Sequence, residues 1–360
     1  MKNNYVIIMA GGIGSRFWPM SKTSFPKQFH DILGVGKSLL QLTAERFKKI
    51  CPKENIYIVT NSDYKDLVKD QLPFLKSNQI LLEPFRKNTA PCIAYATYKI
   101  HYLNNNAKLV IVPSDHIILN QQEFENTIHI ALDKADDNQL ITLGILPTRA
   151  DTGYGYIQFE EFKSNADSKV KKVKTFTEKP PKEMAIKFVE SGEFLWNSGM
   201  FIWSSNSIIN AFTKLSPDLH KLFDESSSKF NTEEEMRTID TIYPLCKNIS
   251  IDNAIMEKAN NVLVVPSDFG WSDLGTWGSL YENLEKDSND NAIVGEKVIL
   301  YNASKNIVRV SENKLVVIEG LENYIVVEND KTLLICKKEN EQNIKSYVQD
   351  VKAKFKNEDV

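Results

Sequence analysis

The sequence predicts an α/β protein: a Rossmann-like, mostly parallel sheet with helices on both faces, then a small C-terminal β domain and a terminal helix. Two observations carry this prediction. Strand-like and helix-like segments alternate through the first two-thirds of the chain, and from about residue 287 short β-rich runs follow one another without a long helix between them. Alternation of strands and helices is typical of βαβ units, which build parallel sheets.

The strand-like runs of the first part are short and apolar, and they cover residues 5–9, 56–60, 80–82, 109–112 and 140–143. Apolar side chains between Leu39 and Ile50 recur three or four positions apart, which predicts a helix after the first strand. Ligands of such sheets bind beyond the carboxyl ends of the strands. The loops that follow residues 9 and 112 are therefore the first candidates for a functional site.

The polar, turn-rich string KDSNDNAIVG begins at residue 286 and marks the change in pattern. We place a domain boundary here, with a catalytic domain over residues 1–286 and a small β-rich domain over residues 287–360. The runs KVILY, NIVRV, KLVVIE, YIVVE and TLLICK are its predicted strands, and the coils of a short β-helix are one arrangement of them. Apolar residues three and four positions apart from Ile344 to Phe355 predict an amphipathic terminal helix.

Composition excludes several classes of protein. The formal net charge is −3, which argues against a nucleic-acid binder, and no apolar run approaches the roughly 20 residues that a membrane helix needs. The apolar N-terminal stretch is too short for a signal peptide. Four widely separated cysteines and five histidines favour reduced thiols over a zinc site or disulfides. We expect a cytoplasmic protein that binds neither nucleic acid nor membranes.

The first strand ends in the loop MAGGIGSRFWPMSKTSFPKQF, residues 9–29. It does not match the dinucleotide fingerprint, because Phe17 stands where the third glycine belongs. The mononucleotide P-loop is excluded further on, because Asp31 stands where its first glycine is required. We interpret Gly36-Lys37-Ser38 as a turn in which Ser38 caps the next helix.

The loop nevertheless has the chemistry of a phosphate site. Glycines allow backbone N–H groups to approach an anion closely, and three lie together at Gly11, Gly12 and Gly14. Arg16 adds a planar fork suited to phosphate oxygens, and Lys27 adds a compact positive charge. A glycine-rich turn with incidental surface charges is the alternative interpretation.

Two aspartates in distant segments suggest a metal site. Asp115 comes shortly after the run 109–112, and Asp273 lies in the string FGWSD. Mg²⁺ is usually held by one or two carboxylates together with substrate phosphates and water. A single Asp at a strand end is more often a turn residue, so the residues alone leave a metal site and two turns open.

The loop string GGIGSRFWPMSKTSFPKQF resembles the signature of the sugar-phosphate nucleotidyltransferases, particularly the mannose-1-phosphate guanylyltransferases. Similar strings recur in order as EPFRKNTAPCIA, VPSDH, TGYGYI, FTEKP, WNSGMF, SIDNAIMEK and DFGWSDLGTW. The resemblance therefore extends over about residues 5–280. It implies the nucleotidyltransferase fold and the transfer of GMP from GTP to mannose 1-phosphate, with Mg²⁺, giving GDP-mannose and pyrophosphate. It also implies a short form without the isomerase domain of some longer relatives, and we expect a homodimer.

The resemblance implies a set of site residues. The expected catalytic residues are Arg16, Lys27, Asp115, Lys179 and Asp273, of which Asp115 and Asp273 would be the metal ligands. The expected nucleotide-binding residues are Ala10, Gly11, Gly12, Gly14, Ser15, Arg16, Glu83, Asn88, Thr89, Ser114 and Asp115. The expected sugar-binding residues are Gly155, Glu178, Lys179, Asn197 and Gly199. Lys27 and Lys179 would neutralise the sugar phosphate, and Arg16 the departing pyrophosphate.

Several of these residues, and the function itself, have alternative interpretations. Asn88, Thr89 and Pro91 are typical of a helix start, which explains them without a ligand but leaves Glu83 unexplained. His116 is expected to shape the loop beside Asp115, and Phe201 and Trp203 to be core residues. A nucleotidyltransferase for another hexose 1-phosphate and nucleotide, such as a glucose-1-phosphate uridylyl- or thymidylyltransferase, is the alternative enzyme. A non-catalytic paralogue that senses GDP-mannose is the alternative outside enzymes.

Overall fold

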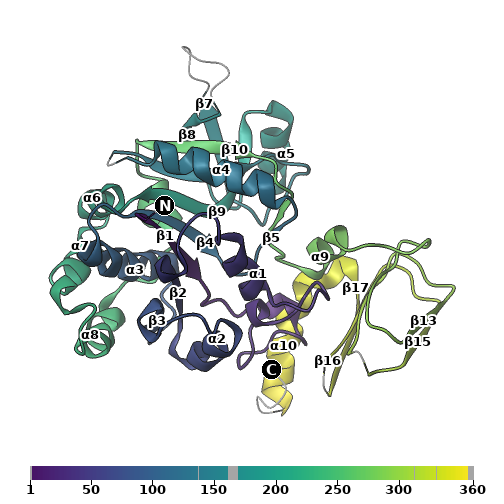
Figure 1. Cartoon of the computed structure of the whole chain (residues 1–360). Coiled ribbons are helices and arrows are strands. Elements are labelled where there is room, and N and C mark those ends of the chain that lie inside the picture. The colour runs from purple at the N-terminus through teal and green to yellow at the C-terminus, as the bar shows by residue number, and fades with distance from the viewer. Residues whose placement is uncertain (1, 137, 161–168, 312, 330, 356–360) are drawn as a thin grey trace. The chain divides into compact units, whose positions relative to one another are not determined.

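The computed structural model describes residues 2–136, 138–160, 169–311, 313–329 and 331–355 (Figure 1). These residues form two compact units, between which the chain passes several times. Unit 1 takes its described residues from Met1–Gly11, Thr43–Ser114 and Ile118–Trp271, and unit 2 from Gly12–Leu42, Asp115–Ile117 and Ser272–Val360. The boundary predicted at residues 286 and 287 falls within unit 2, so the glycine-rich loop folds together with the C-terminal segment. The boundary itself stays a prediction.

Unit 1 is built on a nine-stranded sheet with the order β3-β2-β1-β4-β9-β6-β10-β8-β7. Its strands are β1 (Asn4–Met9), β2 (Ile56–Asn61), β3 (Ile80–Glu83), β4 (Lys108–Pro113), β6 (Leu140–Ile145), β7 (Tyr156–Glu160), β8 (Lys171–Thr177), β9 (Phe194–Ser204) and β10 (Val262–Ser267). All five predicted strands are present, as β1, β2, β3, β4 and β6. The first four run parallel, with Ile8 of β1 beside Ile58 of β2 and Val112 of β4.

The sheet is mostly parallel, as predicted, and also contains antiparallel strands: strands β1, β2, β3, β4, β6 and β10 all run in one direction. Strand β9 lies between β4 and β6 and runs antiparallel to both. Strand β8 is antiparallel to β7 and to β10. The sequence did not show which strands are antiparallel, because apolar periodicity indicates a strand but not its direction, which depends on how the connection returns to the sheet.

Helices cover the sheet, as predicted. The helices of unit 1 and its border are α1 (Leu39–Arg46), α2 (Lys65–Gln71), α3 (Thr89–Leu103), α4 (Gln121–Lys134), α5 (Lys182–Ser191), α6 (Ser205–Leu215), α7 (Pro217–Asp224) and α8 (Glu235–Ile242). Ile7 of β1 belongs to the same core as residues of α3, α6, α7 and α8, which lie together in Figure 1. Val6 and Ile8, on the opposite face of β1, are also fully buried. Both faces of the central strands are therefore covered.

The helix start predicted at Ser38 is confirmed. The Ser38 hydroxyl accepts from the Gln41 amide at 3.2 Å, and the Gln41 side chain accepts in return from the Ser38 amide at 3.0 Å. This reciprocal pair is a capping box for α1. Asp31 accepts from the amides of Gly34 and Gly36 and closes the turn before the helix. The carboxylate that rules out a P-loop is thus part of that turn.

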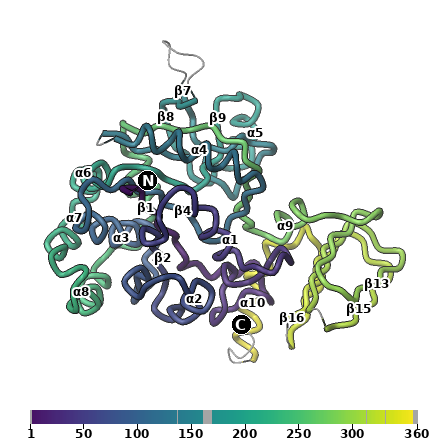
Figure 2. The backbone as a smooth tube through the Cα atoms, viewed as in Figure 1, coloured from purple at the N-terminus to yellow at the C-terminus, as the bar shows by residue number. Residues whose placement is uncertain are grey.

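The C-terminal part of unit 2 is a short β-helix, as the predicted coils suggested. Its strands are β12 (Ala292–Val294), β13 (Val298–Tyr301), β14 (Ile307–Arg309), β15 (Val316–Glu319), β16 (Tyr324–Asn329) and β17 (Thr332–Lys337). From β12 to β16 successive strands alternate between two small sheets, in which β12, β14 and β16 are parallel and β13 and β15 are parallel, and β17 then pairs antiparallel with β16. Figure 2 shows the backbone of these runs as stacked coils. The predicted terminal helix is α10 (Ile344–Phe355).

Two stacked asparagines hold the coils together. Asn306 is fully buried, and its side-chain nitrogen donates to Asn291 Oδ1 at 3.0 Å and to the Leu321 carbonyl at 2.7 Å. Its Oδ1 accepts from the Tyr324 amide at 2.8 Å. Buried polar groups must be paired in this way, because an unpaired one costs free energy.

None of the described helices is long and apolar enough to cross a membrane. All four cysteines, which lie in the described part of the chain, are buried and form no disulfide.

We expect Asn306→Ala to lower the free energy of unfolding by about 2–4 kcal/mol, because it removes three side-chain hydrogen bonds at a fully buried position and leaves the Tyr324 amide without its acceptor. The measurement is denaturant-induced unfolding followed by circular dichroism. Asn289→Ala, at an exposed asparagine of the same segment, is the control and should change stability little. Equal effects of the two substitutions would contradict this account of the coils.

Candidate active site

The glycine-rich loop is shaped by close approach of its own side chains. Gly14 has φ +70°, and a Cβ there would lie 2.6 Å from Lys27 Cβ. Only glycine satisfies both conditions, so Gly14 allows the loop to fold back over Lys27. A Cβ at Gly12, by contrast, would meet no atom within 4 Å. Steric crowding within the fold therefore does not explain why position 12 is a glycine.

Unit 2 contains a cavity of about 320 Å³ beside this loop. Its lining residues come from segments far apart in sequence: Gly14, Ser15, Arg16, Phe17, Lys27, Asp115, His116, Asp273, Leu274, Gly275 and Lys345. It therefore brings together four of the five expected catalytic residues, and the fifth, Lys179, belongs to unit 1. The sequence did not predict that Lys345 of α10 lines this cavity. The spacing of apolar residues in a helix shows which face is buried, but not which residues the polar face lies beside.

Lys27 is the centre of the unit 2 cavity's polar contacts. Its side chain is buried, at 3% exposure, and its ammonium lies 2.7 Å from Asp115 Oδ2. The same group donates to the carbonyls of Asp273 at 3.1 Å and Leu274 at 2.9 Å. It also lies 5.3 Å from the centre of the Phe17 ring. One buried cation thus links three segments that are distant in sequence.

Asp115 is ionised despite its surroundings. Burial acts to raise the pKa of its carboxyl, but the charge of Lys27, the nearby His116 and the hydrogen bond from Lys27 outweigh burial and lower the pKa. His116 Nε2 lies 4.0 Å from Asp115 Oδ1. When it is protonated, His116 acts on Asp115 through its charge, which is compatible with its expected role in shaping the loop.

Asp273 is held by the turn that follows it. Its Oδ1 accepts from the Gly275 amide at 2.9 Å, and a Cβ at Gly275 would lie 2.7 Å from Asp273 Oδ2. Leu274 between them has φ +45°, a conformation that a leucine adopts only when its surroundings enforce it. Thr276 and Ser279 then form a capping box at the start of α9 (Trp277–Asn283). The position of Asp273 is therefore well determined.

The two aspartates that line the cavity have the ligand chemistry that a hard divalent cation prefers. Among the described residues, no group of three or more His, Cys, Asp or Glu side chains could hold a metal ion. Mg²⁺ does not need such a group, because it takes one or two carboxylates and completes its shell with phosphate oxygens and water. The Lys27 ammonium contacts both Asp115 and the backbone of Asp273, so positive charge is favourable beside them.

In unit 1, the expected nucleotide-binding residues lie at strand ends and at the start of α3. Ala10 and Ser114 directly follow β1 and β4, and the Ser114 amide donates to the Met9 carbonyl at 3.0 Å. Asn88 has φ 67° and ψ −170°, which is a rare conformation for any residue except glycine. Its side chain accepts from the Thr89 amide at 2.9 Å. Such strain is characteristic of ligand-binding positions.

Glu83 ends β3 and is buried, at 5% exposure. Its carboxylate accepts a hydrogen bond from the Tyr243 hydroxyl, and a Cβ at Gly11 would lie 3.1 Å from Glu83 Oε2. Burial raises the pKa of Glu83 to about 7, although the Tyr243 bond and the Arg86 charge act to lower it. Glu83 thus lies against the first glycine of the loop and can carry its proton near neutral pH.

A second cluster in unit 1 contains the expected sugar-binding residues. We call Gly155, Glu178, Asn197 and Asp252 the Asn197 cluster. A Cβ at Gly155 would lie 2.6 Å from Glu178 Oε2, so only glycine permits this approach. The Asn197 amide donates to the Gly155 carbonyl at 2.8 Å, and its side chain donates to Asp252 Oδ1 at 2.7 Å.

Two further expected residues lie beside the Asn197 cluster. Gly199, with φ +68°, donates from its amide to Asn197 Oδ1 at 3.1 Å. The Asn197 side chain is therefore bound at both ends. Lys179 forms an ion pair with Glu178, is exposed to solvent and has φ +46°.

Asp252 is a functional candidate that the sequence did not single out. It begins the π-helical turn Asp252–Met256, a type of turn often found at functional sites. Burial raises its pKa to about 6, the Asn197 bond lowers it, and the Glu178 charge raises it. The string SIDNAIMEK contains Asp252, but nothing within the string distinguishes this carboxylate from a surface one.

Asp252 is also tied to the start of α3 through the segment before it. The Ile251 amide donates to the Thr89 hydroxyl at 2.8 Å, and the Ala90 amide donates to the Ile249 carbonyl at 3.1 Å. Within unit 1, one short segment therefore supports both the Asn88 turn and the Asn197 cluster.

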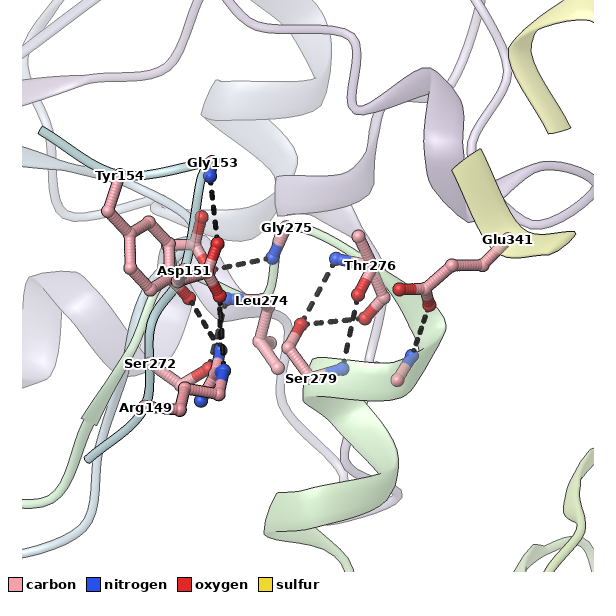
Figure 3. Close-up of polar contacts among 12 residues, drawn as sticks. Arg149, Asp151, Gly153, Tyr154, Ser272, Leu274, Gly275, Thr276, Ser279 and Glu341 are labelled. Atoms are coloured by element: carbon pink, nitrogen blue, oxygen red, sulfur yellow. Dashed lines mark hydrogen bonds and ion pairs between the residues drawn. The ribbon is translucent and has the colours of Figure 1, made fainter. Parts of the chain in front are cut away.

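An arginine stacked on aromatic rings is a second feature that the sequence did not reveal. Arg149 lies 5.3 Å from the centre of the Trp196 ring and 5.8 Å from that of Tyr154. Asp151 Oδ2 accepts from Arg149 Nε at 3.1 Å and from Nη2 at 2.7 Å (Figure 3). Phe201 and Trp203, in contrast, lie in the core, as predicted.

Comparisons with known proteins agree with this geometry. The family model of the nucleotidyl transferases matches residues 5–290, and that of the MannoseP isomerase/GMP-like β-helix domain matches residues 296–351. A mannose-1-phosphate guanylyltransferase of Salmonella montevideo is 37% identical over 98% of this chain and 75% of its own length. One from Escherichia coli is 34% identical over 95% of this chain and 74% of its own length.

A solved structure is also similar over nearly the whole chain. It is a Thermus thermophilus protein described as a mannose-1-phosphate geranyltransferase, with a TM-score of 0.87 and 26% identity. The similarity covers 97% of this chain and 99% of that one. The chain therefore belongs to the nucleotidyl transferase family, with mannose-1-phosphate guanylyltransferases among its relatives.

Proposed function

We propose that this protein is an enzyme that transfers GMP from GTP to mannose 1-phosphate and forms GDP-mannose and pyrophosphate. The observation that carries the proposal is the unit 2 cavity, in which Arg16, Lys27, Asp115 and Asp273 meet beside the glycine-rich loop. Relatives named for this reaction, similar along almost the whole chain, support the choice of substrates.

The chemistry needs little from the protein beyond position and charge. A phosphate monoester has a second pKa of about 6, so the sugar phosphate is largely ionised at neutral pH and needs no general base. One of its oxygens attacks the α-phosphorus of GTP. As the new P–O bond forms, the bond to the bridging oxygen of the β-phosphate breaks, and pyrophosphate leaves with the electron pair. The main obstacle is the repulsion between two polyanions.

We assign the phosphate groups of GTP to the unit 2 cavity. The amides of the loop at Gly12, Gly14 and Ser15 would approach the phosphate oxygens, and Arg16 would bind the departing pyrophosphate. Asp115 and Asp273 would hold a divalent cation, which supplies positive charge against the phosphates when it is bound. Lys27 keeps Asp115 ionised and ties it to the Asp273 turn, which supports its assignment as a catalytic residue.

We assign the sugar to the Asn197 cluster and the nucleoside to residues at the strand ends of unit 1. Carboxylate and amide groups such as Glu178 and Asn197 can accept from and donate to hydroxyls. Asp252 fixes the orientation of the Asn197 amide. Lys179 would meet the sugar phosphate. The nucleoside contacts would come from Ala10, Gly11, Glu83, Asn88, Thr89 and Ser114. A homodimeric assembly and a cytoplasmic location stay predictions.

The decisive experiment is a matrix of pyrophosphate release. Four nucleoside triphosphates are each combined with the 1-phosphates of mannose, glucose and N-acetylglucosamine. We expect kcat/KM to be highest for GTP with mannose 1-phosphate, because the relatives carry that specificity in their names. A higher value for another pair would favour the alternative enzyme, and release from no pair would favour a non-catalytic sensor.

We expect Asp273→Asn to lower kcat by about 10²–10³, because one preorganised charge at the reacting phosphates is lost. The measurement is steady-state pyrophosphate release, with circular dichroism as the check on folding. Asp268→Asn, at an exposed aspartate of the same segment, is the matched control and should keep wild-type activity. Wild-type turnover by a folded Asp273→Asn protein would remove Asp273 from the proposed mechanism.

We expect Asp252→Asn to raise KM for mannose 1-phosphate about tenfold and to leave KM for GTP within twofold, because the charged acceptor that orients Asn197 is lost. In an Asn197→Ala background the same change should add little, since Asp252 acts through Asn197. Lys258→Ala, at an exposed residue two positions after the turn, is the control. A rise in both KM values would indicate a general loss of structure instead.

A further inference from the structure

Two cations from opposite ends of the chain line the unit 2 cavity. Arg16 belongs to the glycine-rich loop, and Lys345 lies in the first turn of α10. The charge of Arg16 is the main cause that lowers the pKa of Lys345, and burial is the second. The two side chains are therefore close enough to repel each other across the cavity.

Packing holds Lys345 in this position. Its neighbour Ile344 is fully buried, as is Phe17, and both belong to one core together with Trp18 and Val348. Helix α10 thus lies against the short helical turn Ser15–Phe17 that carries Arg16. The place of Lys345 beside the cavity follows from buried contacts and does not depend on its own flexible side chain.

The segment before α10 makes two further polar contacts with residues at or near the cavity. The Gly278 amide, at the start of α9, donates to Glu341 Oε2 at 2.7 Å (Figure 3). Arg16 Nε donates to Gln342 Oε1 at 3.2 Å. The C-terminal segment is therefore tied both to the turn after Asp273 and to Arg16, which are two separate walls of the cavity.

Two carboxylates, those of Asp115 and Asp273, line the same cavity as these two cations. Among the residues that the structure describes, neither Arg16 nor Lys345 forms an ion pair with a carboxylate. Lys27, the third cation of the cavity, is already paired with Asp115. Two like charges that line one cavity repel each other, and an anion that binds between them removes this repulsion. An anion with several charges, such as a di- or triphosphate, is the ligand that relieves the repulsion.

We propose that Lys345, together with Arg16, binds the β- and γ-phosphates of the nucleoside triphosphate and the pyrophosphate that leaves. This inference rests on the proposed function for the identity of the ligand. It gives the C-terminal segment a direct part in the reaction, because the segment supplies one of the charges that stabilise the leaving group.

The test follows pyrophosphate as a substrate of the reverse reaction, in which GDP-mannose and pyrophosphate give GTP and mannose 1-phosphate. We expect Lys345→Ala to raise KM for pyrophosphate about tenfold and to leave KM for GDP-mannose within twofold. Lys345→Arg keeps the charge and should recover most of the affinity. Lys345 is exposed, so neither substitution should disturb the fold.

Lys352→Ala provides a matched control. Lys352 lies seven positions further along α10, which is almost two helical turns, so it has the same charge and lies on nearly the same face of the helix. It does not line the cavity. We expect wild-type KM values for Lys352→Ala. A non-specific effect of surface charge would instead weaken pyrophosphate binding equally in Lys345→Ala and Lys352→Ala.

Direct binding of inorganic pyrophosphate, measured by calorimetry, separates this inference from the proposed function. A wild-type protein that binds pyrophosphate tightly but forms no GDP-mannose would contradict the proposed function. If Lys345→Ala then bound pyrophosphate about tenfold more weakly, the assignment of Lys345 would still hold. Unchanged pyrophosphate affinity in Lys345→Ala, in either case, would overturn it.

Discussion

The buried ammonium of Lys27 is the contact on which the rest of the unit 2 cavity depends. It binds the Asp115 carboxylate and the carbonyls of Asp273 and Leu274. A buried charge is tolerated only when it is paired and hydrogen-bonded, so these three segments have to come together where Lys27 lies. The left-handed Gly14 allows the loop to close over Lys27, and the strained Leu274 presents its carbonyl to the ammonium.

The terminal helix belongs to the same arrangement. Phe17 and Trp18 of the loop share a core with Trp277 of α9 and with Ile344 and Val348 of α10. Loss of packing in this core would therefore displace Arg16 and Lys345 together. The family models divide the chain near residue 290, yet the folded units do not follow that division. Sequence domains and compact units can differ when a loop of one domain completes the core of the other.

In unit 1, too, one short segment is hydrogen-bonded to several parts of the site. The segment from Ile249 to Asp252 is hydrogen-bonded to Thr89 and Ala90 at one end and to Asn197 at the other. Motifs that are 100 residues or more apart are thereby held by one short piece of backbone. The strain at Asn88 is maintained by these bonds, since the conformation is unfavourable without them.

The sequence by itself determined what depends on neighbouring residues. Apolar spacing revealed the five central strands and α10, the Ser38 cap was visible in its own turn, and the quoted motifs identified the family. Only the tertiary structure decided the antiparallel direction of β9, the pairing of Lys27 with Asp115, and the parts of Asp252 and Lys345. The physical reason is range: spacing and capping act over a few residues, whereas each of these contacts joins residues tens to hundreds of positions apart, and no local pattern specifies its partner.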